Sequence, residues 1–431
     1  TQANTALAWL EQSANEPAKS VAKLDRVLND RPAATQAAAA VYAKAQNLEK
    51  LGEQESALGC YLELIEKHPE SSQLPAALLA AARLHDERDQ DREADLLLER
   101  LVKDHAKFEH LDTALYQWAW VLIDLKRETE AAERLTRLHD EFKESRFWTD
   151  GTYRLAELKL QKKQLDDAST LLNELIAAKP ADDLLGHVLY LQGQVAATQH
   201  KWADVSPPLN RLVTEFPQSQ LRVMAEYWLA EADYRTGKLQ SAGTRLADLS
   251  TRIEGQQEAW IAMIPLRQAQ VLAHEKRWNE AEKIAGTIAQ KYPEFRQQYE
   301  ADYLLGRCLG AQAKFTAARD AYERVVRSPV GGRTETAAMA QWMIGETYFQ
   351  QEKYDDAVQA YHRVERLFAF PRWQAAALLQ AGKCHETQGH WREAIQLYAQ
   401  VLKEHPQTTF AGEASQRLRV AEQRASGIRL E

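Results

Sequence analysis

The alternation of apolar and polar residues between Ala375 and Pro406 predicts two amphipathic helices joined by a short turn. In the first helix, apolar and small residues recur at intervals of three and four residues, as a buried helical face requires. The second helix starts at Trp391 after a turn at Gly389, and Pro406 ends it because proline cannot continue a helix. Two helices of this length leave apolar surface uncovered, so the pattern predicts that they pack against neighbouring elements.

The same pattern recurs along the whole chain at a nearly constant interval. A small residue, here called the anchor, lies in each first helix, and successive anchors are 37 residues apart except for two steps of 39. The anchors are Ala8, Ala45, Ala82, Ala119, Ala156, Gly193, Ala230, Ala269, Gly306, Gly345 and Gly382. Alanine stands twelve residues after most anchors, a tyrosine or leucine sixteen after, an aliphatic residue nineteen after and often a proline twenty-four after. Such periodicity predicts a solenoid of helix pairs.

With these positions, the chain resembles the tetratricopeptide repeat proteins over nearly its whole length. The family's usual repeat has about 34 residues, and here the additional residues follow the closing proline. That longer form is similar to the repeats of bacterial periplasmic proteins such as the TolA-binding protein and the lipoprotein of the outer-membrane barrel-assembly machine. The resemblance implies an all-α, right-handed solenoid of about eleven repeats over residues 1–408, followed by a C-terminal capping helix and tail over residues 409–431.

Three places depart from the regular pattern, and we expect the solenoid to bend there: residues 206–208, 253–265 and 328–333. Pro207 and Pro208 fall in the second helix of the sixth repeat, so that helix is expected to start late, with Ser206 as its cap. Pro265 falls inside a first helix and is expected to kink or delay it. The segment at residues 328–333 is expected to be a flexible turn.

No catalytic signature is present, which favours a protein that is not an enzyme and needs no cofactor. The nearest metal-binding pattern, His385 to His390, has three residues between its glutamate and second histidine, where a zinc protease has two. The cysteines at 60, 308 and 384 are expected to be buried thiols, because the latter two lie two repeats apart. The net charge of −8 is concentrated in residues 1–215, which argues against nucleic acid there, and no apolar run is long enough to span a membrane.

One face of the first helices carries the side chains most typical of a binding surface. Positions three before and one after the anchors are rich in tyrosine, tryptophan and charged residues, and the resemblance implies that this face lines the concave groove of the solenoid. The candidate contacts are Tyr42, Tyr116, Trp120, Tyr153, Glu157, Tyr190, Tyr227, Glu231, Tyr303, Arg307, Trp342 and Glu346. The alternative that the tyrosines only pack between helices stays open. Phe370 and Trp373 are additional aromatics that either join adjacent repeats or form an exposed docking patch.

These observations predict a non-catalytic scaffold that binds an extended segment or a helix of a partner protein. The groove lacks the lysine and asparagine set with which family members hold chaperone tails. The periplasmic resemblance favours an exported bacterial protein of envelope assembly, with a cytoplasmic location as the alternative. A scaffold of a polysaccharide secretion machine and a regulatory arm of a larger enzyme are the rival functions. The sequence settles neither the partner nor the oligomeric state, nor whether a longer protein extends beyond these residues.

Overall fold

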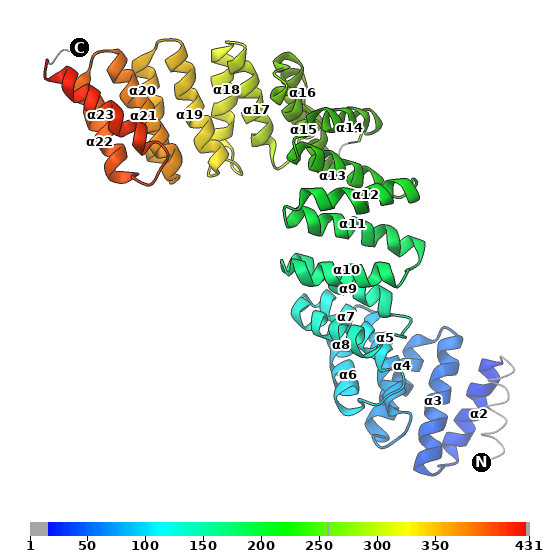
Figure 1. Cartoon of the computed structure of the whole chain (residues 1–431). Coiled ribbons are helices and arrows are strands. Elements are labelled where there is room, and N and C mark those ends of the chain that lie inside the picture. The colour runs from blue at the N-terminus through cyan, green and yellow to red at the C-terminus, as the bar shows by residue number, and fades with distance from the viewer. Residues whose placement is uncertain (1–15, 257, 428–431) are drawn as a thin grey trace. The chain divides into compact units, whose positions relative to one another are not determined.

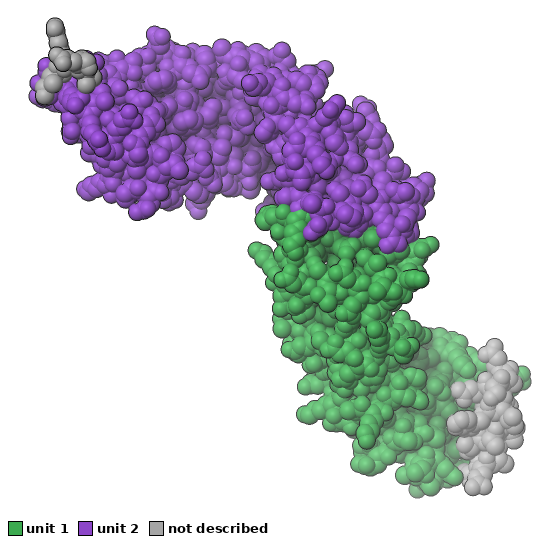
Figure 2. All heavy atoms as spheres, viewed as in Figure 1, with its two compact units in different colours: residues 1–201 green, residues 202–431 purple. Residues whose placement is uncertain are grey.

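The computed structural model describes residues 16–256 and 258–427, and within these ranges every regular element is a helix (Figure 1). The chain divides into two compact units, residues 1–201 and residues 202–431, which are described separately here (Figure 2). The first anchor, Ala8, lies outside the described residues, and so does the end of the predicted tail at residues 428–431.

Unit 1 consists of ten described helices that follow one another with short turns. They are α2 (Pro17–Asn29), α3 (Ala34–Lys50), α4 (Gln54–Lys67), α5 (Leu74–Asp86), α6 (Asp91–Asp104), α7 (Leu111–Asp124), α8 (Glu128–Glu141), α9 (Trp148–Gln161), α10 (Leu165–Ala177) and α11 (Asp182–Thr198). Consecutive helices pack against each other, and first helices also meet those of the next repeat, as α5 meets α7.

Unit 2 continues the same plan and adds one short 3-10 helix. Its helices are α12 (Trp202–Glu215), α13 (Arg222–Arg235), α14 (Leu239–Arg252), η1 (Ala259–Ala262), α15 (Met263–His274), α16 (Trp278–Lys291), α17 (Gln298–Ala311), α18 (Phe315–Arg327), α19 (Glu335–Gln350), α20 (Tyr354–Leu367), α21 (Pro371–Thr387), α22 (Trp391–Glu404) and α23 (Ala411–Ala425). The last helix, α23, packs on α22 and buries Ala414 and Ala421, as a terminal cap should.

The helix order confirms the predicted solenoid of helix pairs. The pairs run from α3 with α4 to α21 with α22, and α2 is the second helix of the first predicted repeat. The sixth pair is divided between the units, since α11 belongs to unit 1 and α12 to unit 2. The bends expected at residues 206–208, 253–265 and 328–333 stay predictions, because the helix order within each unit does not test them.

The repeated apolar positions form the core. All described anchors are buried, as are the residues twelve, sixteen and nineteen after them, for example Ala94, Leu98 and Leu101 on α6. Alanine at the anchor and twelve residues later lets the two helices of a pair approach closely, while the larger residues fill the space between repeats. The sequence periodicity therefore located most of the core correctly.

Each turn between the helices of a pair contains one residue in the left-handed backbone region. It lies seven residues after the anchor in every described repeat, as at Gly52, Gly237 and Gly389. Elsewhere the position is not glycine: Ala313, for instance, has φ 56°. This conformation ends the first helix and lets the chain reverse direction.

The prediction for Pro207 and Pro208 was wrong. The second helix of the sixth repeat begins at Trp202, with both prolines inside it. The prolines lack the N–H groups that would bond four residues back, which costs stability. The same helix places Val205, Leu209 and Leu212 in the core, each 0% exposed. We attribute the early start of the helix to this burial, which a shorter helix would lose in part.

The other two irregular segments lie at residues 253–265, of which residue 257 is not described, and at residues 328–333. Helix α15 is delayed as predicted, because η1 precedes it and Pro265 falls in its first turn, where a missing N–H has little cost. At residues 328–333, Gly332 N donates to Ser328 O at 2.8 Å, and Gly331 is buried. A side chain at Gly331 would collide with the Tyr299 ring, so close packing requires glycine there.

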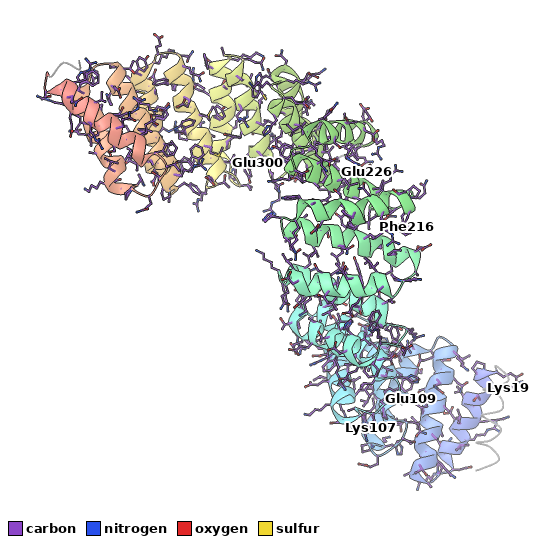
Figure 3. The ribbon with its side chains drawn as sticks, viewed as in Figure 1. Lys19, Lys107, Glu109, Phe216, Glu226 and Glu300 are labelled. Carbon is purple, nitrogen blue, oxygen red and sulfur yellow. The ribbon has the colours of Figure 1, made fainter. Side chains whose placement is uncertain are left out.

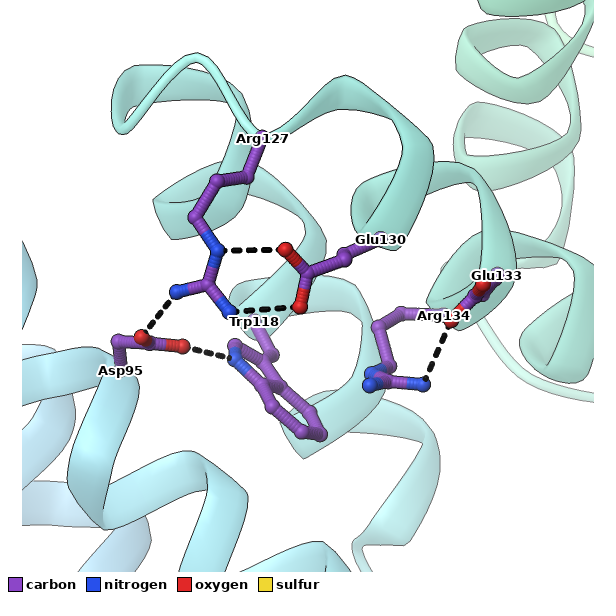
Figure 4. A network of polar contacts seen from close by, with 6 residues as sticks. All are labelled: Asp95, Trp118, Arg127, Glu130, Glu133 and Arg134. Atoms are coloured by element: carbon purple, nitrogen blue, oxygen red, sulfur yellow. Dashed lines mark hydrogen bonds and ion pairs between the residues drawn. The ribbon is translucent and has the colours of Figure 1, made fainter.

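A polar network joins α6, α7 and α8 on the edge of the core (Figure 4). The indole Nε1 of Trp118 donates to Asp95 Oδ1 at 2.7 Å, and the guanidinium of Arg127 donates to the other oxygen of Asp95. Arg127 also forms a two-bond pair with Glu130, and the guanidinium carbon of Arg134 lies 4.1 Å from the centre of the Trp118 ring. Asp95 therefore links two successive repeats through one carboxylate.

Replacing Asp95 with alanine is expected to destabilise unit 1 by about 1–3 kcal/mol, because the buried Trp118 N–H loses its acceptor. Hydrogen exchange of the α6 and α7 amides would measure the change. The matched control is Glu130→Ala, whose exposed pair with Arg127 is screened by solvent and should contribute little to stability. Equal effects of the two substitutions would contradict this account.

Candidate partner-binding face

The candidate residues lie on one side of the first helix of each pair, here called the first-helix face. It is defined by the residues six and three before each anchor and one and four after it, spacings that place side chains on one helical stripe. Side chains of this face contact the next first helix in several repeats of each unit, as Glu49 contacts Arg83 in unit 1 and Glu346 contacts Gln380 in unit 2. The face is therefore a continuous surface across neighbouring repeats of one unit.

At the start of unit 1, the first-helix face combines an aromatic ring with a charged pair. Tyr42 is half-buried, and its ring centre lies 5.7 Å from that of Tyr61. The Tyr61 hydroxyl donates to Glu49 Oε1 at 2.6 Å, and Arg83 of the next repeat pairs with the same carboxylate. Glu49 was not among the predicted contacts.

An aromatic cluster on α7 and just before the start of α9 forms the middle of the unit 1 face. Tyr116 stacks on Phe147 with ring centres 4.6 Å apart, and Trp120 meets Tyr116 edge-on at 6.2 Å. The Tyr116 hydroxyl donates to Asp150 of the next repeat. Burial, reinforced by Asp150, raises the pKa of Tyr116 to about 12, so its hydroxyl remains a donor at neutral pH.

The following repeats extend this face toward α11. Tyr153 donates to Glu157 Oε1 at 3.0 Å, and its ring centre lies 6.2 Å from that of His187. The guanidinium of Arg154 bonds the other oxygen of Glu157 at 2.8 Å. Tyr190 is half-buried at the equivalent position of the sixth repeat. The structure thus places Tyr153, Glu157 and Tyr190 on one partly exposed surface.

In unit 2, Tyr227 and Glu231 do not fit the role predicted for them. Both are buried, and the carboxylate of Glu231 is enclosed by two arginines. Its Oε2 lies 2.5 Å from Arg267 Nε on α15, and its Oε1 accepts from Arg235 Nε at 2.7 Å. Because these contacts are internal, we leave both residues out of the proposed binding surface. Burial raises the pKa of Tyr227 to about 12.

The remaining unit 2 candidates lie on α17 and α19 and are at least partly accessible. Tyr303 is half-buried and Arg307 is exposed on α17, which also carries Glu300 (Figure 3). Trp342 on α19 is half-buried. Beside it, Glu346 accepts the Tyr361 hydroxyl at 2.6 Å and Gln380 Nε2 at 2.5 Å. Arg307 makes no ion pair among the residues that the structure describes.

Trp373, one of the two additional aromatics, contacts the first helix of the preceding repeat. The ring centres of Trp373 and Trp342 are 5.8 Å apart, and Trp373 Nε1 donates to Glu335 Oε1 at 2.8 Å. Phe370 and Trp373 both pack against the core while remaining partly accessible. Trp373 therefore joins the first helices of the tenth and eleventh repeats.

The sequence did not predict that carboxylates on this face accept hydrogen bonds from buried tyrosines. Glu49 and Glu386 each stand four residues after an anchor, and each accepts the hydroxyl of the tyrosine sixteen residues after that anchor. The signal was available, because tyrosine at the latter position and glutamate at the former occur together in both repeats. A glutamate or a tyrosine at one of these positions alone does not indicate the hydrogen bond between them.

Two findings concern metal binding and membrane insertion. Within 16–256 and 258–427, there is no group of three or more histidine, cysteine or acidic residues that could hold a metal ion. No described helix is both long and apolar enough to cross a membrane. Cys308 and Cys384 are buried free thiols, and burial raises the pKa of Cys308 to about 11.

The family models that match the chain all describe tetratricopeptide repeats. Models described as tetratricopeptide repeat match residues 39–71, 113–145 and 336–403, and one described as tetratricopeptide repeat-like domain matches residues 187–339. No curated protein matches the sequence.

Several solved structures are similar to the chain at low sequence identity. YrrB, described as a TPR protein with an unusual peptide-binding site, is 18% identical over 47% of this chain and 97% of its own, with a TM-score of 0.40. Naa15/Naa10 bound to HypK-THB is 12% identical over 99% of this chain and 67% of its own, with a TM-score of 0.44. PilF of Pseudomonas aeruginosa is 14% identical over 54% of this chain and 98% of its own, with a TM-score of 0.42.

The family matches, together with the helix pairs and the repeated core positions, show that the chain belongs to the tetratricopeptide repeat proteins. The fold of this family suggests a scaffold for protein–protein interaction, and its members are generally non-catalytic.

Proposed function

We propose that this protein is a non-catalytic scaffold that binds an extended segment or a helix of a partner protein along the first-helix face. The observation that carries the proposal is the row of half-buried aromatic side chains three residues before the anchors. The row consists of Tyr42, Tyr116, Tyr153, Tyr190, Tyr303 and Trp342.

Three properties make this row suited to binding. Aromatic side chains offer a large contact area at low entropic cost, and they are enriched among residues that dominate binding energies. Hydrogen bonds such as that from Tyr153 to Glu157 hold the rings in place before a partner arrives. Charged side chains between the rings, such as Arg307, can select the partner's register.

The resemblance of the long repeats to those of bacterial periplasmic proteins favours a partner in envelope assembly. This location and role are part of the proposal, and fractionation of the native cells would test them. Photo-crosslinking distinguishes a binding role of the aromatic rings from the alternative that they only pack between helices.

Photo-crosslinking from defined positions tests the binding face directly. A photoreactive amino acid would replace Gln194 or Arg307 on the first-helix face or, as the control, Leu96 on α6, which is 66% exposed. Irradiation in native extract is expected to give a discrete adduct from the first two positions and none from Leu96. Adding Trp120→Ala should lower the yield at Gln194 about tenfold, as loss of a binding hot spot would.

A discrete adduct from Leu96 alone would move the binding surface to the second helices. No adduct from either first-helix position would contradict the proposal. Circular dichroism of each variant would show that the helices are intact.

A further inference from the structure

Three tyrosines in this chain share one internal contact. Each lies sixteen residues after its anchor, is buried, and donates its hydroxyl to a glutamate of the first helix. The contacts are Tyr61 to Glu49, Tyr361 to Glu346 and Tyr398 to Glu386, each at 2.6 Å. Each glutamate also accepts from the next repeat or the capping helix, through Arg83, Gln380 and Arg417 respectively. At this position, a buried tyrosine is therefore associated with a carboxylate on the first-helix face.

Tyr322 in the ninth repeat lacks such a partner. It is 0% exposed, and its hydroxyl is buried without a hydrogen bond among the described residues. The residue four after the anchor is Gly310, where Glu49 and Glu386 stand in their repeats, and the residue one after is Arg307 instead of Glu346. An unsatisfied buried hydroxyl is costly, so this donor is available to an acceptor that reaches it.

The surroundings of Tyr322 favour a negatively charged acceptor. A Cβ atom added at Gly310 would find only the Tyr322 hydroxyl within 4 Å, at 3.9 Å, so the first-helix face is open above this glycine. Arg307 is exposed and has no ion pair among the described residues. Its positive charge opposes the rise that burial causes in the pKa of Tyr322. The Tyr322 hydroxyl, the positive charge of Arg307 and the missing side chain at Gly310 thus occur in one place.

We propose that the first-helix face of the ninth repeat binds a carboxylate of the partner segment, which accepts from the Tyr322 hydroxyl and pairs with Arg307. The proposal rests on the proposed scaffold function and specifies the chemistry of the segment that is bound. The partner's carboxylate occupies the place that Glu49 and Glu386 fill internally in their own repeats.

The unpaired state of the hydroxyl is tested without a ligand. Tyr322→Phe is expected to leave the opening constants of the α17 and α18 amides in hydrogen exchange unchanged or lower. The matched variant Tyr361→Phe loses its bond to Glu346 and should raise those of α19 and α20 about fivefold or more. A comparable rise in both variants would show that Tyr322 already has a partner, which would overturn the proposal.

A carboxylate supplied by the chain itself tests whether the site accepts one. Gly310→Glu is expected to lower the opening constants around α18 about tenfold relative to Gly310→Gln, a control with similar helix propensity. In a Tyr322→Phe background, this advantage should shrink because the donor is absent. An equal effect of the two substitutions, or an advantage that persists without the hydroxyl, would overturn the proposal.

The ligand is tested with the whole chain on an array of acidic peptides. Each peptide is paired with versions in which Glu and Asp become Gln and Asn, and each has a free or an amidated C-terminus. Peptides that bind are expected to lose about tenfold in affinity toward Tyr322→Phe, Arg307→Gln and Gly310→Glu. The paired versions show whether the carboxylate comes from a side chain or from the C-terminus.

Three outcomes would each reject the carboxylate site. The wild type and Tyr322→Phe could bind the peptides equally, binding could survive removal of every carboxylate, or no acidic peptide could bind. In those cases, a partner crosslinked at Gln194 in unit 1 would still support the scaffold. Failure of the site is thereby distinguishable from failure of the proposed function.

Discussion

Replacing Arg267 with alanine is expected to destabilise the repeats around α13 and α15 by about 3 kcal/mol, the largest effect that we expect from a single substitution. Arg267 pairs with Glu231 across two repeats, and the two side chains are only 11% and 4% exposed. Removal of the arginine leaves a buried carboxylate whose remaining ion-pair partner is Arg235, which is 48% exposed. We place the effect at the lower end of the range for broken buried pairs because Arg235 still donates.

Hydrogen exchange of the α13 and α15 amides would measure this change locally, as is appropriate for a solenoid in which each repeat contacts its neighbours. The matched control is Arg235→Ala, which removes the more exposed partner of the same carboxylate and should have an effect below about 1 kcal/mol. If the two substitutions had equal effects, the buried pair would not be what joins these repeats.

Replacing Gly345 with alanine is expected to destabilise α19 and α20 by about 2 kcal/mol, although alanine favours helix by about 1 kcal/mol over glycine. A Cβ atom at this anchor would lie 2.4 Å from Cε1 of Tyr361, and the tyrosine ring is buried. The ring cannot move aside without disturbing its bond to Glu346, so the added methyl group strains the helix pair.

Tyr361→Leu is expected to rescue Gly345→Ala. Alanine anchors face leucine in other repeats of this chain, as Ala82 faces Leu98 and Ala119 faces Leu135, each fully buried. The double variant should therefore be more stable than the sum of the single changes predicts, with a coupling of about 1 kcal/mol or more. Thermal unfolding of the four proteins gives the coupling, and additive effects would show that ring and anchor do not oppose each other.

These pairings explain a regularity that the sequence contains but that its periodicity does not explain. Glycine anchors at Gly306, Gly345 and Gly382 coincide with tyrosine sixteen residues later, and most alanine anchors coincide with leucine. The two positions touch in the folded repeat, so a larger side chain on one helix favours a smaller one on the other. Ala45 with Tyr61 is an exception that the described contacts do not explain.

The spacing of residues along the chain was enough to predict the helices, their pairing and most of the core. Those features follow from short-range spacing, which places apolar residues on one side of each helix and repeats every 37 or 39 residues. It also located the stripe to which the binding face belongs, because residues three and four apart share a helical face whatever lies beside them.

Which members of that stripe are accessible depends on contacts between helices, which the spacing does not contain. Tyr227 and Tyr153 occupy the same position in their repeats, yet Tyr227 is buried and Tyr153 is half-buried. Glu231 is enclosed because Arg267 reaches it from another repeat. The Tyr322 hydroxyl has no partner among the described residues because its own repeat has glycine where others have glutamate. Burial and polar pairing depend on side chains from neighbouring helices, so the spacing within a single helix cannot specify them.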